Sequence, residues 1–192
     1  MKPFYELLSD FPGCECAKRA LDIAIAGKHS VLLIGGQAAR ALAEAAYPHI
    51  PERQPPPGAM PYCGHPRIIT IGVVSPCPCG FFGHPKRECR CQLQQIQKHV
   101  LTWPRCDITV EVPEPSFGDY QRAGWFKGVD KDAVEFLEHA AANVYGFGIE
   151  DIRRILAVAR TIAKLSESEA VRIEAVSEAI QTCGSHYHLH GR

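Results

Sequence analysis

Residues 30–46 read SVLLIGGQAARALAEAA, and this stretch decides the fold class that the sequence predicts. Ser30 to Ile34 form a short, continuous apolar run that ends in glycines, which is typical of a buried parallel strand. The alanine-rich run from Ala38 to Ala46 favours a helix. A strand, a glycine turn and a helix in this order form the scaffold of a phosphate-binding loop.

The turn Gly35-Gly36-Gln37 lacks most of the chemistry that phosphate binding needs. A working phosphate-binding loop is longer and ends in a Lys for the β- and γ-phosphates and a Ser or Thr for magnesium. Here the turn runs directly into alanines and Arg40, and Lys28 lies before the strand. One interpretation is a vestigial phosphate site with Arg40 as a weak substitute for the Lys. The other, which the residues favour, is an ordinary strand-to-helix turn.

A second informative stretch is SPCPCGFFGHPKRECRC (residues 75–91), which carries two Cys-x-Cys pairs. Prolines and glycines around the pairs favour a loop that folds back on itself. Four soft thiolates brought together suit a closed tetrahedral site. The sequence therefore predicts zinc held by Cys77, Cys79, Cys89 and Cys91. The alternatives are an iron–sulfur site and a set of reduced thiols in a loop.

The composition is that of an ordinary globular protein of 192 residues, 46% hydrophobic and 22% charged, which is enough for one domain or two small ones. The formal net charge of zero gives no global field toward nucleic acid or membrane. The first residues carry acids and no long apolar run, so we expect neither a signal peptide nor a membrane partner, and a cytoplasmic location. In a reducing compartment, clustered cysteines indicate metal ligation before disulfides. Small apolar filler is expected at the other cysteines: Cys14, Cys16, Cys63, Cys106 and Cys183.

The rest of the chain divides into an α/β part and an all-helical part. Further strands are predicted at 65–74 and 107–112, and further helices at 14–26, 92–100, 130–144, 150–165 and 169–182, the last with Ser168 as its cap. A proline-rich connector is expected at 48–66 and a loop at 113–127.

The shift in composition predicts two domains and a tail. The α/β core is expected at 1–113 and includes the cysteine loop 75–91, and the helical domain is expected at 129–183. Residues 184–192 are expected to be a disordered tail. Its alternating His186, His188 and His190 leave transition-metal binding as the alternative.

Several segments resemble one known family. They are Pro76-Cys-Pro-Cys-Gly80, Pro85-Lys-Arg-Glu-Cys-Arg-Cys91 and Gln95-Ile-Gln97, together with residues 154–163 in the helical part. These segments are similar to the magnesium-chelatase-like AAA+ family, in particular its competence-related branch of proteins similar to DNA branch-migration helicases. The resemblance implies a reduced AAA+-like parallel sheet with flanking helices, a C-terminal helical lid and zinc in the cysteine loop.

The sequence departs from that family at the positions that handle nucleotide. Paired acids are absent between Ala46 and Arg67, Ser75 stands where a sensor Asn is expected, and Glu150 stands where the lid has a sensor Arg. Arg105 matches a position that resembles an arginine finger, which reaches a neighbouring subunit's phosphate. Because phosphoryl transfer depends on positioning and charge neutralisation, these losses predict a protein that does not hydrolyse ATP.

Three functions stay open from the sequence. The first is a catalytically degenerate pseudo-ATPase that acts as an assembly or regulatory partner of itself or of an intact AAA+ protein. The second is a zinc-stabilised DNA-binding module, because a local basic patch can contact phosphates. The segment between Cys77 and Cys106 contains five basic residues and one acidic residue, Glu88, so its local charge is five minus one, or +4. These basic residues are Lys86, Arg87, Arg90, Lys98 and Arg105. The third is a weak ATP-binding ATPase that uses non-standard residues.

Overall fold

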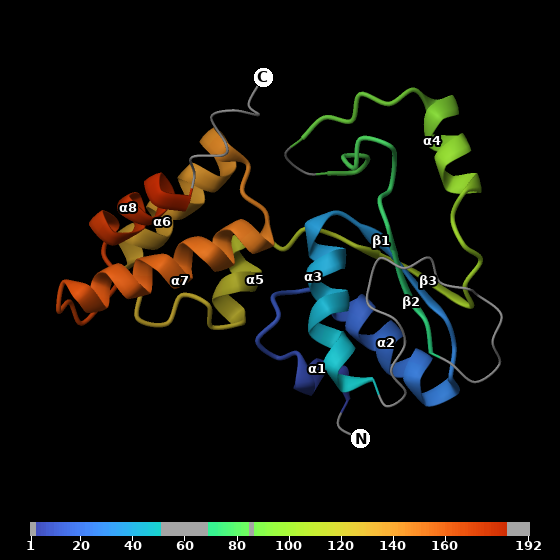
Figure 1. Ribbon diagram of the computed structural model, residues 1–192, viewed down its shortest axis with the longest axis horizontal. Coiled ribbons are helices and arrows are strands. Elements are labelled where there is room, and N and C mark those ends of the chain that lie inside the picture. The colour runs from blue at the N-terminus through green and yellow to red at the C-terminus, as the bar shows by residue number, and fades with distance from the viewer. Residues whose placement is uncertain (1–2, 51–68, 85–86, 184–192) are drawn as a thin grey trace. The chain divides into compact units, whose positions relative to one another are not determined.

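The computed structural model describes residues 3–50, 69–84 and 87–183, which form two compact units (Figure 1). The first unit covers Met1–Ala123 and the second Gly124–Arg192. Most of the proline-rich stretch, Cys63, Lys86 and the histidine tail lie outside the described residues. Each unit has its own core and is described by itself.

The first unit is built on a parallel sheet of three strands in the order β2-β1-β3. They are β1 (Val31–Gly35), β2 (Ile71–Val74) and β3 (Ile108–Val112). The central strand β1 pairs with both neighbours, and Val31 to Ile34 are buried. A strand covered on both faces needs a continuous apolar run, which is what its sequence provides. The predicted α/β fold with a parallel sheet is confirmed.

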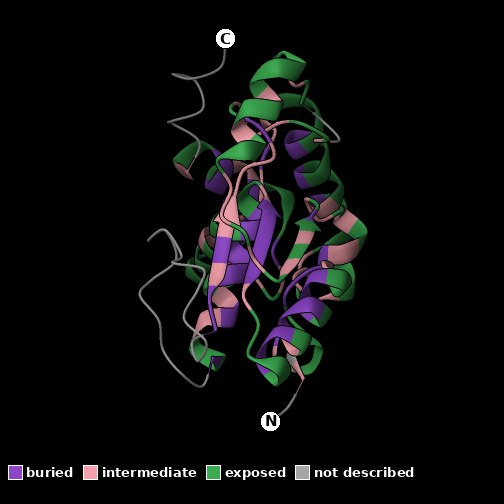
Figure 2. Ribbon diagram, turned by 90° about the vertical axis from the view of Figure 1, so that its right-hand side faces the viewer, coloured by how far each residue is buried: buried purple, intermediate pink, exposed green. Residues whose placement is uncertain are grey.

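Two helices, α2 (Glu15–Gly27) and α3 (Gln37–Ala46), pack on the sheet. α2 contacts β1 and β3, and α3 contacts β1 and β2. Figure 2 shows that buried residues gather on the sheet and on the inner sides of helices. The buried side of α3 is made mostly of alanines, whose small side chains let the helix backbone approach the strands. The short helices α1 (Phe4–Leu7) and η1 (Tyr47–His49) complete this part.

Helix α4 (Leu93–Leu101) differs from these helices because none of its residues is buried. It is tied to the end of β2 by His99, whose Nε2 lies 3.1 Å from the Ser75 Oγ and 3.0 Å from the Ser75 carbonyl oxygen. Leu93 and Leu101 are strongly exposed, at 68% and 85%. The helix therefore lies beside the sheet without contributing to its core.

The prediction of a loop at 113–127 is wrong for its middle residues, which form helix α5 (Phe117–Arg122). The helix starts with a reciprocal cap. The Ser116 N–H donates to the Asp119 Oδ2 at 2.8 Å, and the Asp119 N–H donates to the Ser116 Oγ at 3.3 Å. The Ser-x-x-Asp pattern was the available signal, because it satisfies N–H groups that a short helix leaves open.

The second unit is all-helical, with α6 (Lys131–His139), the π-helical turn η2 (Ala140–Tyr145), α7 (Ile149–Leu165) and α8 (Ile173–Cys183). Its core is aliphatic and consists mainly of Leu137, Ile149, Ile152, Ile155, Leu156, Ala159, Val176 and Ala179. Those on α7 recur about every three or four positions, as an amphipathic helix requires. Within residues 3–50, 69–84 and 87–183, no helix combines the length and the apolar character needed to cross a bilayer.

The prediction that Ser168 caps the last helix and that this helix starts at about Glu169 is wrong. The Ser168 Oγ donates to the Ala170 carbonyl oxygen at 2.7 Å instead of capping a helix. Val171 pairs with Val129 in an isolated bridge, in which the Val171 N–H donates to the Gly128 carbonyl oxygen at 2.8 Å. Because this pairing holds Val171 extended, helix α8 begins at Ile173.

Candidate functional site

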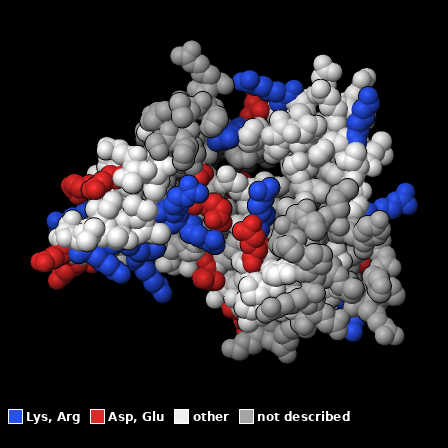
Figure 3. All heavy atoms as spheres, viewed as in Figure 1, with Lys and Arg blue, Asp and Glu red and all other residues white. Residues whose placement is uncertain are grey.

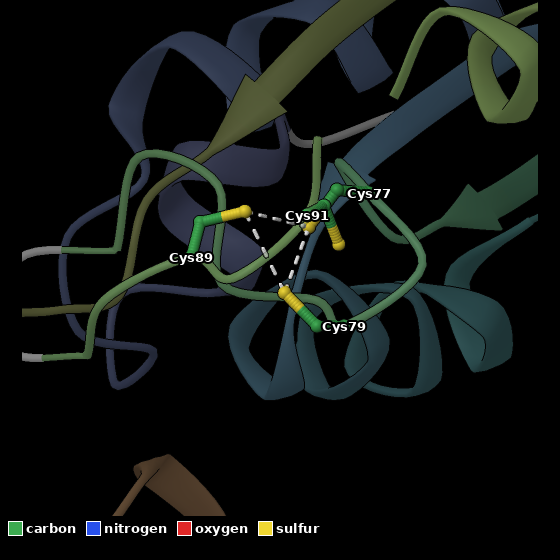
Figure 4. Close-up of side chains that lie close together, drawn as sticks. All are labelled: Cys77, Cys79, Cys89 and Cys91. Atoms are coloured by element: carbon green, nitrogen blue, oxygen red, sulfur yellow. Dashed lines mark hydrogen bonds between the residues drawn. The ribbon is translucent and has the colours of Figure 1, made fainter. Parts of the chain in front are cut away.

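The four cysteines of the 75–91 stretch lie together (Figure 4). The Cys77 Sγ lies 3.3 Å from the Cys79 Sγ and 3.7 Å from the Cys89 Sγ, and the last two sulfurs are 3.6 Å apart. Cys91 completes the group, with all four sulfurs within 4.8 Å of one another. A disulfide would need about 2.05 Å, and tetrahedral zinc bonds of about 2.3 Å place sulfurs about 3.8 Å apart. The cluster can therefore hold a metal ion.

The loop gathers these thiols through local turns that the sequence encodes. Cys77 follows β2 closely and is fully buried. Its carbonyl oxygen accepts from the Gly80 N–H at 3.0 Å, and its Sγ accepts from the Phe82 N–H at 3.3 Å. Gly80 and Gly83 have φ of 81° and 75°, which glycine adopts without a steric penalty. These turns point the first Cys-x-Cys pair back toward the second.

The protonation pattern of the cluster fits a group of sulfurs that share negative charge. A hydrogen bond from the Phe81 backbone N–H lowers the pKa of the Cys79 thiol to about 6. The Cys91 N–H favours the Cys89 thiolate, but desolvation and the bonds from Cys79 and Cys77 outweigh it and raise the pKa of Cys89 to about 12. The hydrogen bond between the Cys91 and Cys79 side chains likewise raises the pKa of the Cys91 thiol. Metal binding would replace these protons and leave four thiolates.

The glycine turn after β1 has a structural explanation that does not involve phosphate. A Cβ on Gly35 would lie 2.5 Å from the Val112 carbonyl oxygen, so the close approach of β3 requires a glycine there. Gly36 follows as the residue before α3, and a Cβ on it would lie 3.0 Å from a Glu114 carboxylate oxygen. Both glycines therefore fit close packing against the segment that ends β3.

Glu114 itself is a site residue that the sequence reasoning missed. Its Oε1 accepts a hydrogen bond from the Ala38 backbone N–H at 3.2 Å, in the first turn of α3. The first N–H groups of a helix carry partial positive charge and attract anions. A carboxylate of the chain thus lies where a phosphate-binding loop would hold its phosphate. The signal was a Glu two residues beyond β3, the parallel neighbour of β1.

A cavity of about 510 Å³ opens beside this turn, at the carboxyl ends of β1 and β3. Gly35 and Gly36 line it, whereas Gln37, Arg40 and Arg105 do not. Arg40 is exposed on α3, and Arg105 is exposed before β3. Of the residues predicted for a phosphate site, only the two glycines therefore reach this cavity.

The start of α2 and the cysteine loop also line the cavity. Cys14, the residue before α2, and Cys16, in the first turn of α2, both line it. The cysteine loop contributes Pro76, Gly80 and Phe82. Cys14 is partly buried, and desolvation raises the pKa of its thiol to about 12. Cys16 is exposed, so the expectation of apolar filler is wrong for this residue.

In the second unit, Glu150 lies in the first turn of α7, and its carboxylate is 3.3 Å from the Arg153 guanidinium.

Residues 123–182 match the family model described as magnesium chelatase, subunit ChlI C-terminal. A search of the curated proteins finds no match to the chain. The matched segment contains α6, η2 and α7 and nearly all of α8, and it includes the 154–163 stretch that carried the resemblance. The helical unit of this chain therefore belongs to the magnesium-chelatase-like family.

Proposed function

We propose that this chain is a metal-stabilised, magnesium-chelatase-like protein that acts as an assembly or regulatory module and does not hydrolyse ATP. The observation that carries this proposal is the Glu114 carboxylate at the start of α3. A nucleotide phosphate placed at these N–H groups would have to displace the carboxylate and would be repelled by it. The missing Lys, Ser or Thr and paired acids then leave nothing to neutralise the transferred phosphoryl group.

Zinc is the metal that the donor set favours. Four thiolates with no oxygen or nitrogen donor among them suit zinc, and a closed set of four protein ligands is typical of a structural site. The loop has little else to order it, since Phe82 is 53% exposed and Phe81 only partly buried. A structural metal supplies the stability that such a small apolar content cannot provide.

The α/β core with its cysteine loop and the helical lid then form the two parts of a partner-binding protein in the cytoplasm. The partner is an intact AAA+ protein or a second copy of this chain. The lid unit supports this proposal because it keeps the family's sequence pattern, although Glu150 stands at the position of the sensor Arg. A module of this kind can add to an assembly without taking part in its chemistry.

Metal content and nucleotide binding, measured on the same purified sample, test this function. The sample should contain about one zinc per chain and give no saturable heat with ATP and magnesium. A sample without metal would contradict the zinc site, and iron with visible colour would redirect it to an iron–sulfur centre. Saturable ATP binding would contradict the non-catalytic role.

A second function, DNA binding, is favoured by the exposed side chains around the cysteine loop. Arg87, Arg90, Lys98 and Arg105 are exposed, against the exposed Glu88, so the described residues give four minus one, or +3. The Arg87 guanidinium lies 5.1 Å from the centre of the Phe81 ring. Exposed cations beside aromatic rings can contact phosphates and stack on bases. Elsewhere, basic and acidic side chains are interspersed on the face shown in Figure 3.

Salt-dependent binding to single-stranded and branched DNA tests this second function. Replacing Arg90 and Lys98 by Ala should reduce the affinity and the slope of its dependence on salt, because each lost phosphate contact releases one counterion fewer. Replacing Arg154 by Ala on the lid is the matched control. Equal binding by all three proteins would contradict DNA binding through this surface.

A further inference from the structure

The cavity of about 510 Å³ at the carboxyl end of the sheet has the size of a small-molecule or side-chain binding site. In open α/β sheets, ligands bind in the crevice beyond the carboxyl ends of the strands. Its apolar lining includes Ala17 of α2 and Ile34 of β1, together with Pro76 and Phe82 of the cysteine loop. An apolar group of several carbon atoms would therefore be desolvated there.

Among the described residues, the carboxylates that line the cavity are Glu15, Glu111 and Glu114, and no Lys or Arg of that part of the chain lines it. His84 is the one further titratable side chain, apart from the cysteines, among these lining residues. Glu15 is neutralised in part by Lys18, whose Nζ lies 3.1 Å from its Oε1. Glu111 is exposed at the end of β3, and within the described residues it forms no ion pair. The cavity thus repels a nucleotide and attracts a cation.

The cysteine loop adds an aromatic ring to this acidic lining. Phe82 is 53% exposed and lines the cavity, so it is accessible to a bound group. A cation above an aromatic face is attracted by the ring electrons, and the effect is stronger where water is partly excluded. Phe82 is also held by the metal loop, since its N–H donates to the Cys77 Sγ. Metal binding and the shape of the cavity are therefore linked.

We propose that this cavity binds a guanidinium or ammonium group carried on an apolar stem, as on an Arg or Lys side chain of a partner protein. The stem lies against the apolar lining, and the cation lies between Glu111 and the Phe82 ring. This inference rests on the proposed function in one respect, because a cavity that holds nucleotide cannot also be a cation site.

Titration of the zinc-loaded full chain with a short blocked peptide, Gly-Arg-Gly, followed by amide chemical shifts, tests the proposal. The same peptide with citrulline in place of Arg has the same shape without the charge. We expect saturable shifts at Gly35, Gly36 and Phe82 with the Arg peptide, and binding about tenfold weaker or absent with citrulline. Agmatine, a free small molecule with the same guanidinium group, distinguishes the two possible sources of the cation: a side chain of a partner protein and a free small molecule. Tighter binding of the peptide supports a partner's side chain, and tighter binding of agmatine contradicts that source.

Two matched variants locate the site. Glu111→Gln should weaken the Arg peptide about tenfold, because it removes an unpaired carboxylate without changing shape. Glu44→Gln removes a carboxylate exposed on the surface of α3 and should leave the affinity unchanged. Equal effects of the two variants, or no saturable shift with the Arg peptide, would overturn the cation site. Saturable ATP binding in the same sample would overturn the proposed function instead, so the two failures are distinguishable.

Discussion

The Glu114 carboxylate accepts a hydrogen bond from the Ala38 backbone N–H at 3.2 Å, across a sequence separation of 76 residues. This contact joins the segment after β3 to the first turn of α3. It places a fixed negative charge at the one point of the α/β core where the strand-turn-helix order alone would predict an anion site. The chain thus retains the scaffold of a phosphate-binding loop and occupies its anion position with its own side chain.

Removal of this contact should destabilise the first unit. Glu114→Ala removes an acceptor that satisfies an N–H group of α3, and loss of such a cap typically costs about 1 kcal/mol of unfolding free energy. Glu114→Gln keeps an acceptor and should cost less. Urea denaturation of both variants beside the unchanged chain measures the difference. An Ala variant as stable as the original would show that the contact contributes nothing.

Replacement of Gly35 should also destabilise the first unit. In Gly35→Ala the new Cβ would lie 2.5 Å from the Val112 carbonyl oxygen, so β1 and β3 must separate. Overpacking of this kind costs about 1–3 kcal/mol. The control is Gly118→Ala in α5, where the nearest atoms to a new Cβ are 3.7 Å away. Thermal denaturation should separate the two variants, and equal midpoints would refute the packing explanation.

Asp107 should make the stability of the first unit depend on pH. Its Oδ2 accepts from the Ser30 N–H and the Ser30 Oγ, each at 2.8 Å, and these bonds lower the pKa of the carboxyl group. A lowered pKa stabilises the fold above the unfolded value of about 3.9, and this contribution is lost as the pH falls through the folded value.

The test compares Asp107→Asn with the unchanged chain. The Asn variant should have the lower denaturation midpoint at neutral pH, and the gap should shrink as the pH falls below about 4. Glu44→Gln serves as the charge-matched control on an exposed helix face. A gap that stays constant across this range would mean that the carboxylate does not stabilise the fold through these bonds.

Loss of one cysteine should release the metal. Cys89→Ser removes one of four thiolate ligands, so metal affinity should fall by at least about tenfold. Cys183→Ser, at the end of α8 and outside the cluster, should leave it unchanged. Cobalt substitution reports the difference through thiolate-to-metal absorption. Full absorption in the Cys89 variant would show that the ion is held by other groups.

The parts of the fold that follow from local sequence could be predicted, and those that depend on distant contacts could not. The apolar run of β1 and the two Cys-x-Cys pairs carry their own signals, so the parallel sheet and the clustered thiols followed from them. The signal for Glu114, its place two residues beyond β3, has no meaning until β3 is known to pair with β1, because only this pairing brings Glu114 to the start of α3. The start of α8 was misplaced for a similar reason, since the bridge between Val129 and Val171 is a non-local contact.

The most direct test of the central claim is a steady-state ATPase assay of the zinc-loaded full chain with magnesium, with and without DNA. With Glu114 at the start of α3 and no Lys, Ser or Thr among residues 37–46, we predict turnover equal to that of a no-enzyme control. Turnover clearly above that control and abolished by Arg40→Ala or Arg105→Ala would contradict the account.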